Sequence, residues 1–364
     1  MSEAENKYKY INDIFFLYIL LIVFILVCAA IGAGAWYLAN HGWDYSSPEV
    51  KKTEPEKSVV CPLTGAKTTE ENAKRRPIGI MVENAQEARP QSGMDKADLV
   101  YEVVAEGGIT RFLAFYACTD ADEIGPVRSA RSYYVDWVAE LKAFYAHVGG
   151  SPDGLAKVKS DNVLDLDQFN NDKYYWRSSN KQAPHNVFTT TAKLRTAGQS
   201  HNWDINASYP VWKFQDLSKK TSSENTTDKK TTPEVATLTS VKIDFSSAPF
   251  VVEYIYDSTK NEWTRKIAGS TQLDKITSQP IKVKNLAVMI TPITARNDKD
   301  SRVDVDTTSG GKAMVFVNGK LTQGTWKKSD NRTKFYDASG SEVVFEAGNT
   351  WISVVQEASR VTYK

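Results

Sequence analysis

The most apolar run of the chain lies close to its N-terminus. Residues 14–39, IFFLYILLIVFILVCAAIGAGAWYLA, contain no charged side chain. About 20 apolar residues are enough for a helix to cross the hydrocarbon core of a bilayer. Tyr18, Trp36 and Tyr37 lie toward the ends of the run, where amphipathic rings settle among lipid headgroups. The pattern predicts a transmembrane anchor at 14–39 after a cytoplasmic tail of residues 1–13.

Three other interpretations of this run were weighed. The AGA triplet at 33–35 resembles a signal-peptide cleavage site, but the run exceeds the usual apolar length of about 7 to 15 residues. Cys28 raises the alternative of a lipoprotein, although the branched residues 25–27 occupy positions where lipid-attachment signals prefer small side chains. A buried core helix would show an amphipathic pattern, and none is visible. We therefore expect an uncleaved signal anchor.

The orientation of the anchor follows only weakly from its flanking charges. Lys7 and Lys9 precede the run and Lys51 and Lys52 follow it, so the positive-inside rule hardly decides. A short N-terminal tail with a large C-terminal part fits a signal anchor that faces outward. We expect a single-pass protein of the cell membrane whose C-terminal ectodomain is extracytoplasmic.

Two polar stretches divide the rest of the chain. Residues 40–75 include SSPEVKKTEPEKS, the composition of an unpacked tether. A second low-complexity stretch, LSKKTSSENTTDKKTTPEV, predicts a linker at 216–237, because long structureless segments usually connect domains. This division predicts two domains, at 76–215 and 238–364.

The first predicted domain alternates strand and helix patterns, which favours a mixed α/β sheet with packed helices. Ser151 and the proline after it have the arrangement of a helix N-cap and first helical position. The predicted strands are IGIMVEN (78–84), LVYEVVAE (99–106), ITRFLAFYAC (109–118) and AFYAHVGG (143–150), and the predicted helices are SYYVDWVAELK (132–142) and SPDGLAKVK (151–159).

The second predicted domain is a succession of strands with short turns. Asn-Gly in VNGK (317–320) stands between two β-type runs, a strong hairpin signal. The pattern predicts a small all-β domain, with strands in PFVVEYIYD (249–257), EWTRKIAG (262–269), IKVKNLAVMI (281–290), KAMVFVNGKLTQGTW (312–326) and WISVVQ (351–356).

Composition narrows the possible functions. The 364 residues carry a formal net charge of +1, so nothing global favours nucleic acid as a partner. The few cysteines and histidines do not fall at metal-ligand spacing, and the cysteines do not suggest a disulfide framework. We therefore expect no metal site and no cofactor; the residues considered are Cys28, Cys61 and Cys118 with His41, His147, His185 and His201.

Several motifs carry a family resemblance that covers nearly everything from residue 61 onward. They are CPLTG (61–65), RPIGIMVEN (76–84), ARPQSGMDKADLVYEVVAEGGITRF (88–112), IGPVRSARSYY (124–134), HVGGSPDG (147–154) and APHNVFTTTAKL (183–194), followed by WTRKIAG (263–269), VKNLAVM (283–289), FVNGK (316–320) and AGNTWISVV (347–355). In these motifs the chain resembles the YerB-like family of bacterial envelope proteins. The resemblance implies an extracytoplasmic, membrane-tethered protein without a settled activity. The chain departs from it by an N-terminal anchor where other members resemble lipoproteins.

Charged residues of the first domain fall at strand ends and turns, where α/β folds gather their function. The guanidinium groups of the arginines in EGGITR and GPVRSAR suit phosphate or carboxylate groups. The segment HVGGSP leads into a predicted helix, and the backbone N–H groups at the start of a helix also bind anions. We expect an anion-binding cleft formed by Arg89, Arg111, Arg128, Arg131, Gly149, Gly150, Ser151 and Asn186. The candidates for proton transfer are Glu106, His147 and His185.

Each of these residues also has an ordinary structural interpretation. Arg111 and Glu102 fit a cross-strand ion pair, His147 fits a satisfied core histidine, and His185 fits a loop residue bound to a carbonyl group. The leading hypothesis is a membrane-anchored envelope protein that binds an anionic cell-wall or lipid-linked glycan.

The sequence leaves open whether the protein is an enzyme. The order of strands and Arg loops is similar to that of the LytR-CpsA-Psr phosphotransferases, but GPVRSAR lacks the Asp that follows Arg in their motif. A glycan-cleaving enzyme and a scaffold for other envelope proteins are further alternatives. A close group of Glu106, His147 and His185 around a polar pocket would favour an enzyme, and a flat apolar patch on the second domain would favour a scaffold.

Overall fold

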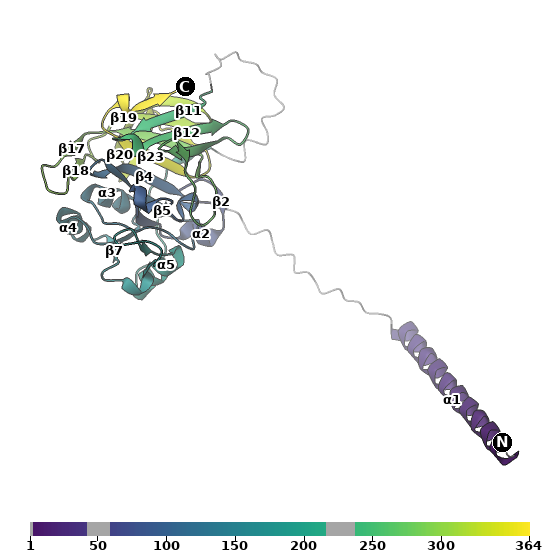
Figure 1. The fold of residues 1–364 in the computed structure, drawn as a ribbon. Helices are drawn as coiled ribbons and strands as arrows, with labels where there is room; N and C mark the ends of the chain where they lie inside the picture. Colours follow the sequence, from purple (N-terminus) through teal and green to yellow (C-terminus); the bar gives the residue numbers. More distant parts are fainter. Residues whose placement is uncertain (1–2, 42–58, 216–236) are drawn as a thin grey trace, which may run out of the picture. The chain divides into compact units, whose positions relative to one another are not determined.

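The computed structural model describes residues 3–41, 59–215 and 237–364. The chain forms two compact units, Met1–Glu56 and Lys57–Lys364. In the first unit the described residues form a single helix, α1 (Glu3–His41) (Figure 1). Its segment Phe16–Asn40 has a mean hydropathy of 3.0 and is long and apolar enough to cross a membrane. The helix expected over 14–39 is confirmed, whereas its crossing of a membrane and the side on which residues 1–13 lie stay predictions.

The second unit is built around one sheet of ten strands, in the order β21-β20-β19-β16-β23-β4-β5-β3-β6-β7. Strand β23 pairs in parallel with β16 on one side and with β4 on the other. Figure 1 shows the strands of both halves of the chain side by side. The bounds are β3 (Ile78–Glu83), β4 (Leu99–Glu106), β5 (Ile109–Tyr116), β6 (Phe144–His147), β7 (Leu164–Asp167), β16 (Asn285–Ile290), β19 (Gly311–Val317), β20 (Lys320–Ser329), β21 (Arg332–Asp337) and β23 (Thr350–Val355).

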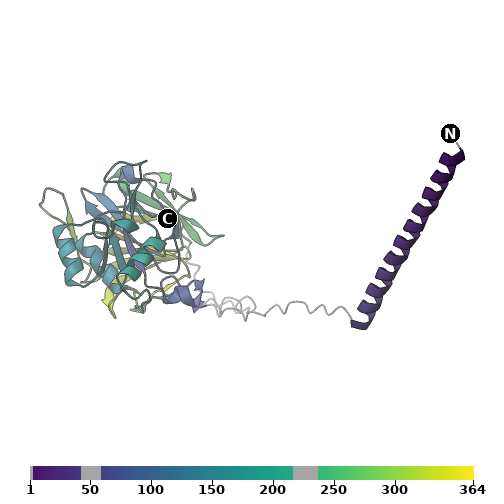
Figure 2. The same cartoon turned by 90° about the horizontal axis from the view of Figure 1, so that it is seen from below.

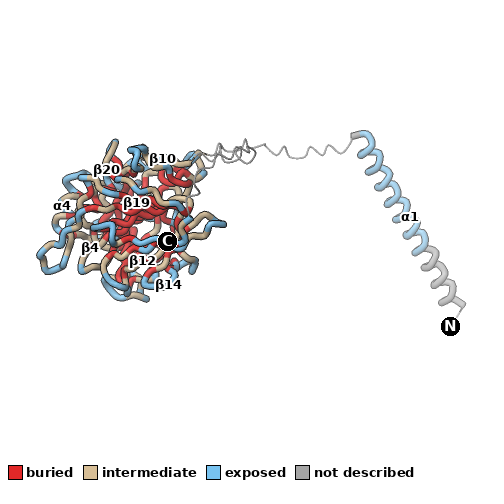
Figure 3. Tube along the Cα trace, turned by 90° about the horizontal axis from the view of Figure 1, so that it is seen from above, coloured by how far each residue is buried: buried red, intermediate tan, exposed pale blue. Residues whose placement is uncertain are grey.

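A smaller sheet of six strands lies against one face of the large sheet. Its apolar side chains join those of the large sheet in a common core, together with residues of the last helix before the linker. Its strands are β11 (Ser240–Asp244), β12 (Val251–Asp257), β13 (Glu262–Ile267), β14 (Ser270–Thr271), β15 (Lys282–Val283) and β24 (Val361–Tyr363). Figure 3 shows that the buried residues follow the strands through the middle of this unit.

The helices complete the cover of the large sheet. Side chains of α3 and α4 join a second core on the opposite face, and α5 contributes to the first core. Although they cover different faces, these three helices all lie toward the β7 end of the unit (Figures 1 and 2). The helices are α2 (Glu70–Lys74), α3 (Ser132–Glu140), α4 (Pro152–Ser160) and α5 (Thr191–Ser200).

Four two-stranded pairs lie at the periphery. One of them, β10 (Lys213–Phe214) with β22 (Val344–Phe345), is parallel and again joins the two halves of the chain. The others are β1 (Val59–Val60) with β2 (Lys67–Thr68), β8 (Trp176–Arg177) with β9 (Val187–Phe188), and β17 (Ile293–Ala295) with β18 (Val303–Val305).

The predicted elements agree closely with this structure. The α/β character of residues 76–215 and the β-rich character of residues 238–364 are confirmed. Ser151 is the N-cap of α4, and its hydroxyl oxygen accepts a hydrogen bond from the Gly154 amide. Asn318 and its following glycine have φ angles of 54° and 69°, as the hairpin between β19 and β20 requires.

The expected boundaries between parts need correction. The two predicted domains share the ten-stranded sheet, so 76–215 and 238–364 are parts of one compact unit. The tether expected at 40–75 is shorter, because residues 59–74 form β1, β2 and α2. Most of the expected linker at 216–237, and the rest of the tether from residue 42 to 58, lie outside the described residues.

The cysteines also differ from expectation. Cys61 and Cys118 form a disulfide across 57 residues of sequence, with their Cα atoms 6.1 Å apart. Sequence spacing did not suggest this bond, because only the fold brings the end of β1 next to the end of β5. Cys28 is a free, exposed cysteine in α1.

One buried ion pair crosses between the two sheets. Arg265 of β13 donates from Nη2 to Glu102 Oε2 of β4 at 2.8 Å, and neither side chain is more than 1% exposed. Asn84 Nδ2 and Thr110 Oγ1 donate to the other oxygen of Glu102. The charges are therefore fully compensated inside the protein, as burial of an ion pair requires.

Breaking this pair from one side should destabilise residues 57–364 strongly. Glu102→Gln and Arg265→Met should each lower the free energy of unfolding by about 3–5 kcal/mol, because each leaves one buried charge without its partner. The double variant should lose much less than the sum of the single losses. Urea unfolding at pH 7 measures all four free energies, and additive losses would contradict the interaction.

Candidate functional site

The ends of three neighbouring strands, β4, β5 and β3, place charged side chains close together. Glu83 is the last residue of β3 and lies opposite Arg111 in the register of β3 and β5. Glu106 ends β4, and the turn to β5 uses Gly107 and Gly108 at φ angles of 55° and 78°. These angles suit glycine, which has no Cβ to clash. The EGGITR turn thus places Glu106 within reach of the first residues of β5.

Glu106 binds two of the predicted arginines. Its Oε1 accepts a hydrogen bond from Arg111 Nη2 at 2.5 Å, and its Oε2 accepts one from Arg131 Nη2. Arg111 also donates from Nη1 to the carbonyl oxygen of Ser129 at 3.0 Å. Burial alone would raise the pKa of Glu106, but the two arginines outweigh it and hold the pKa below its ordinary value. Glu106 therefore ties the GPVRSAR segment to the strand ends.

Arg128 differs from these two arginines because part of its guanidinium group is not engaged. Its Nε lies 3.0 Å from Glu83 Oε1, and the other oxygen of Glu83 lies 2.7 Å from His185 Nδ1. The terminal nitrogens of Arg128 form no hydrogen bond with any described residue, and its side chain is 21% exposed. Arg128 thus presents free N–H donors toward solvent.

We name this group the arginine cluster: Arg111, Arg128 and Arg131 with Glu83 and Glu106. Three guanidinium groups face two carboxylates, which leaves one positive charge in excess. Burial lowers the pKa of Arg128, Glu83 and Glu106 raise it, and the like charges of Arg111 and Arg131 lower it further. The cluster would accept an additional negative charge because that charge would relieve this repulsion.

Two amides of the expected oxyanion cradle are already engaged within the protein. The Gly149 amide donates to Asp167 Oδ1 at 2.8 Å, and the Ser151 amide donates to the carbonyl oxygen of Ala130 at 3.2 Å. Gly150 forms a parallel bridge with Ala130. These contacts hold the diglycine turn against Ala130 of the GPVRSAR segment, whereas the Gly150 amide donates no hydrogen bond to any described residue.

His147 lies completely inside the protein. Its Nδ1 is 2.8 Å from the carbonyl oxygen of Gly149, and its Nε2 is 3.0 Å from Asp165 Oδ1. No hydrogen bond or ion pair joins any two of the three candidates for proton transfer, Glu106, His147 and His185, which are held by separate partners. The three candidates for proton transfer therefore do not converge on one position in this structure.

Two more predicted residues lie outside the arginine cluster. Arg89 donates to the side chain and carbonyl oxygen of Asn84, and its guanidinium group lies 5.1 Å from the ring centre of Phe250. Asn186 accepts a hydrogen bond from Arg177 Nη1 at 2.9 Å, beside the β8–β9 pair. Both side chains have structural partners in these contacts.

Sequence reasoning missed Glu83 and Arg265. Glu83 ends an apolar strand and faces Arg111 across the sheet, which only the strand register reveals. Arg265 had a visible signal, since it alternates with Trp263 and Ile267 on the buried face of its strand. A charged residue at an apolar position of a strand indicates a buried partner.

Several surface pockets lie elsewhere. Four of them have volumes between about 330 and 560 Å³, and none of these four is lined by a residue of the arginine cluster. Within the described ranges, no three His, Cys, Asp or Glu side chains are placed to hold a metal ion. The arginine cluster therefore lies outside these four pockets.

Comparison with known proteins gives consistent matches along the chain. Residues 63–204 match the N-terminal domain, and residues 241–352 the C-terminal domain, of a protein of unknown function designated DUF3048. A Bacillus subtilis (strain 168) protein named "Putative lipoprotein YerB" is 31% identical over 311 residues, which cover 83% of this chain and 87% of that protein.

A solved structure agrees with the fold. The crystal structure of the YerB protein from Bacillus subtilis matches with a TM-score of 0.75 and 29% identity, over 84% of this chain and 99% of that chain. The arrangement of the two halves described above is therefore shared with an experimentally determined structure.

Replacing Glu106 should destabilise the protein in a pH-dependent way. The pKa of Glu106 is lowered in the folded protein, so its stabilising effect is complete above the unfolded-state pKa and fades as the pH falls through the folded-state pKa. Glu106→Gln should therefore cost about 3 kcal/mol of unfolding free energy at pH 7, and clearly less at pH of about 3.

Urea unfolding at both pH values measures the difference. Glu71→Gln is the matched control, because Glu71 is 84% exposed and its pair with Arg75 lies on the surface. A loss at pH 7 no larger than that of the control, or one that does not shrink at acidic pH, would contradict the assigned role of Glu106.

Proposed function

The chain belongs to the DUF3048 family, and on that premise we propose that it is a single-pass envelope protein whose outward-facing part binds an anionic cell-wall or lipid-linked glycan. Its likeness to YerB and its apolar N-terminal helix indicate an envelope-associated protein. A fold does not by itself specify a function, so the proposed ligand and orientation rest on particular residues.

The observation that carries the binding proposal is the unengaged end of Arg128. A planar guanidinium group with free terminal nitrogens matches the geometry of phosphate and carboxylate oxygens. Arg111 and Arg131 lie close enough to repel Arg128, so an anion bound there would be favoured by three positive charges against two negative ones.

The partners of the cluster support recognition and not turnover. Arg111 and Arg131 are held by Glu106, and Glu83 holds both Arg128 and His185. A catalytic site for phosphotransfer or glycan cleavage would need acid and base groups that converge on one reacting atom. The three candidates for this role lie in separate contacts, and we therefore propose binding.

The disulfide supports the outward orientation. Cys61 and Cys118 are bonded in the folded structure, and disulfides persist mainly in oxidising compartments outside the cytoplasm. The Bacillus subtilis relative is named as a lipoprotein, which is also a protein held at a membrane surface. We propose the apolar helix α1 as the corresponding membrane attachment of this chain.

Arg128→Gln should weaken binding of an anionic glycan to residues 57–364, the compact second unit. Purified peptidoglycan, teichoic acid and polyprenyl-phosphate vesicles would be tested in parallel. We expect about tenfold weaker binding to the fraction that carries the ligand, because one charge-assisted contact is lost. Arg131 is left unchanged because it also holds the fold.

The matched control is Arg360→Gln, because Arg360 is a partly exposed arginine just before β24 that pairs with Asp244 and Glu357. It should bind like the unchanged protein. Equal binding by the Arg128 variant and the control, or no binding of any of the three fractions by the unchanged protein, would overturn the proposal.

The orientation has a separate test on intact cells. Protease added outside should digest residues 57–364, while a cytoplasmic marker protein stays intact until the cells are permeabilised. We expect loss of the full-length band because the second unit faces outward. Full protection of the chain in intact cells, followed by digestion after permeabilisation, would place this unit in the cytoplasm.

A further inference from the structure

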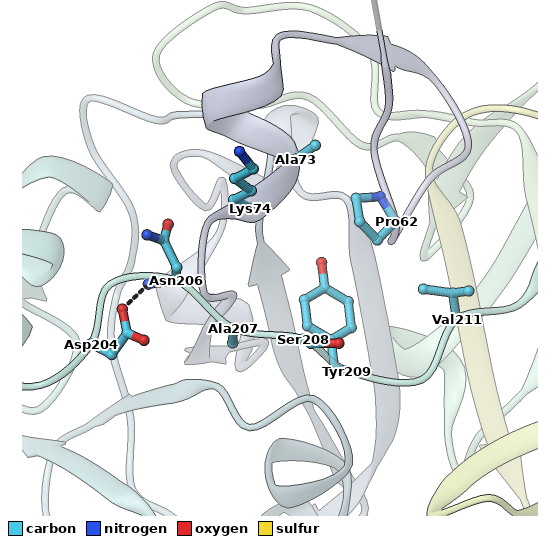
Figure 4. Close-up of a pocket in the computed structure, with 9 residues that line it drawn as sticks. All are labelled: Pro62, Ala73, Lys74, Asp204, Asn206, Ala207, Ser208, Tyr209 and Val211. Atoms are coloured by element: carbon cyan, nitrogen blue, oxygen red, sulfur yellow. Dashed lines mark hydrogen bonds between the residues drawn. The ribbon is translucent and has the colours of Figure 1, made fainter.

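A pocket of about 510 Å³ lies between the N-terminal hairpin region and the segment that follows α5. Figure 4 shows the ring of Tyr209 standing in the middle of this pocket, with Pro62 and Val211 on one side and Lys74 on the other. The arginine cluster contributes no residue to it. The full lining is Pro62, Ala73, Lys74, Asp204, Asn206, Ala207, Ser208, Tyr209 and Val211.

The Tyr209 hydroxyl is a buried polar group without a partner. The side chain is 8% exposed, and its oxygen forms no hydrogen bond. Buried tyrosine hydroxyls usually have a hydrogen-bond partner, because leaving one unsatisfied costs free energy. The hydroxyl is therefore available as a donor to a ligand in this pocket.

A second unsatisfied group lies in the same core. Three arginines of the described residues are almost completely buried: Arg111, Arg265 and Arg332. The first two bind Glu106 and Glu102, respectively, whereas Nε and Nη1 of Arg332 form no hydrogen bond and no carboxylate pairs with it. An uncompensated buried cation is costly, so its persistence indicates a missing negative partner.

Glu140, whose carboxylate binds the residue that follows Arg332, already has its own partners. Glu140 accepts hydrogen bonds from the amide and the hydroxyl of Thr333, at 2.9 and 2.8 Å, and pairs with Lys328 at 3.3 Å. It is therefore bound by three groups other than Arg332. Among the described residues, no carboxylate forms an ion pair with Arg332.

Trp212 connects Arg332 to the wall of the pocket. The Arg332 guanidinium carbon lies 4.3 Å from the ring centre of Trp212, and Trp212 Nε1 donates to the carbonyl oxygen of Thr333 at 2.8 Å. Trp212 directly follows Val211, a lining residue. Tyr209 and Trp212 belong to the same buried cluster, and Arg332 lies over the Trp212 ring. Burial raises the pKa of Tyr209, and the charge of Arg332 opposes this rise.

We propose that Arg332, Tyr209 and Trp212 form a binding site for a small oxyanion, a carboxylate or phosphate group, that enters through this pocket. The guanidinium nitrogens would bind its oxygens, the Tyr209 hydroxyl would donate one more hydrogen bond, and the face of Trp212 holds the cation in place. This site is separate from the arginine cluster and does not depend on the function proposed for it.

Bound anion should stabilise the folded protein, because it interacts with the native state and not with the unfolded chain. The thermal unfolding of the full-length protein in detergent would be followed at constant ionic strength while inorganic phosphate or acetate replaces chloride. All measurements use the Arg128→Gln background, so that anion binding at the arginine cluster does not contribute. We expect the Tm to rise with phosphate, with acetate, or with both.

Arg332→Met should abolish the rise, and Tyr209→Phe should weaken the apparent affinity about tenfold, the loss of one hydrogen bond to a charged group. Without added anion, the Arg332 variant should be at least as stable as its parent, since an apolar side chain replaces an unpaired buried charge. The control is Tyr256→Phe, because Tyr256 is a partly exposed tyrosine bonded to Asn261.

Three results would overturn the proposal. They are the absence of any Tm rise in the parent, the same rise in Arg332→Met as in the parent, and a crystal structure in phosphate that shows only water on Arg332. Should Arg332→Met fail to fold, the comparison of Tyr209→Phe with Tyr256→Phe decides, and equal affinities in these two would count against the site.

Discussion

The buried pair between Glu102 and Arg265 is the constraint on which the rest of this structure depends. It joins β4 of the first half to β13 of the second half, with both side chains inside the protein. Such a pair is tolerated only when every remaining donor and acceptor is also satisfied. The groups that meet this demand come from both halves: Asn84, Thr110, Tyr254 and Gln272 bind the pair, and Phe112, Tyr254 and Trp351 surround the guanidinium group.

This requirement explains why the two halves form one unit. The parallel pairing of β23 with β4 puts Trp351 next to the Glu102 region, and the smaller sheet then covers the face of the large sheet from which Arg265 approaches. A shift of either half would leave a charge buried without its partner. The same registration holds the ends of β3, β4 and β5 in place, and those ends carry the arginine cluster.

Charge compensation also distinguishes structural arginines from candidate binding arginines. Arg265 is fully paired and serves the fold, and Arg128 is paired at one nitrogen and presents the others to solvent. Arg332 is buried and has no anionic partner in the part of the chain that the structure describes. The cost of an unsatisfied charge rises with burial. The arginines with free donors are thus the places where the energy of the fold favours an added anion.

Much of the candidate site was predictable from the sequence. The placement of Arg111, Arg128 and Arg131 at strand ends followed from the hydrophobic pattern, and the structure brings these three together. The pattern could not identify Glu83 as the partner of Arg128, because that pair forms only when the GPVRSAR segment lies beside β3. It also could not separate the partly exposed Arg128 from the buried His147, because their burial depends on the segments that pack around each of them.

By itself the sequence determined the apolar N-terminal helix, the order of strands and helices, the Asn-Gly hairpin and the polar segments between them. These features depend on side chains close together in the chain, so their periodicity and turn residues are sufficient. Only the tertiary structure decided that both halves share one sheet, that Cys61 meets Cys118, and which arginines are compensated. Those outcomes depend on contacts between residues far apart in sequence, which local patterns do not encode.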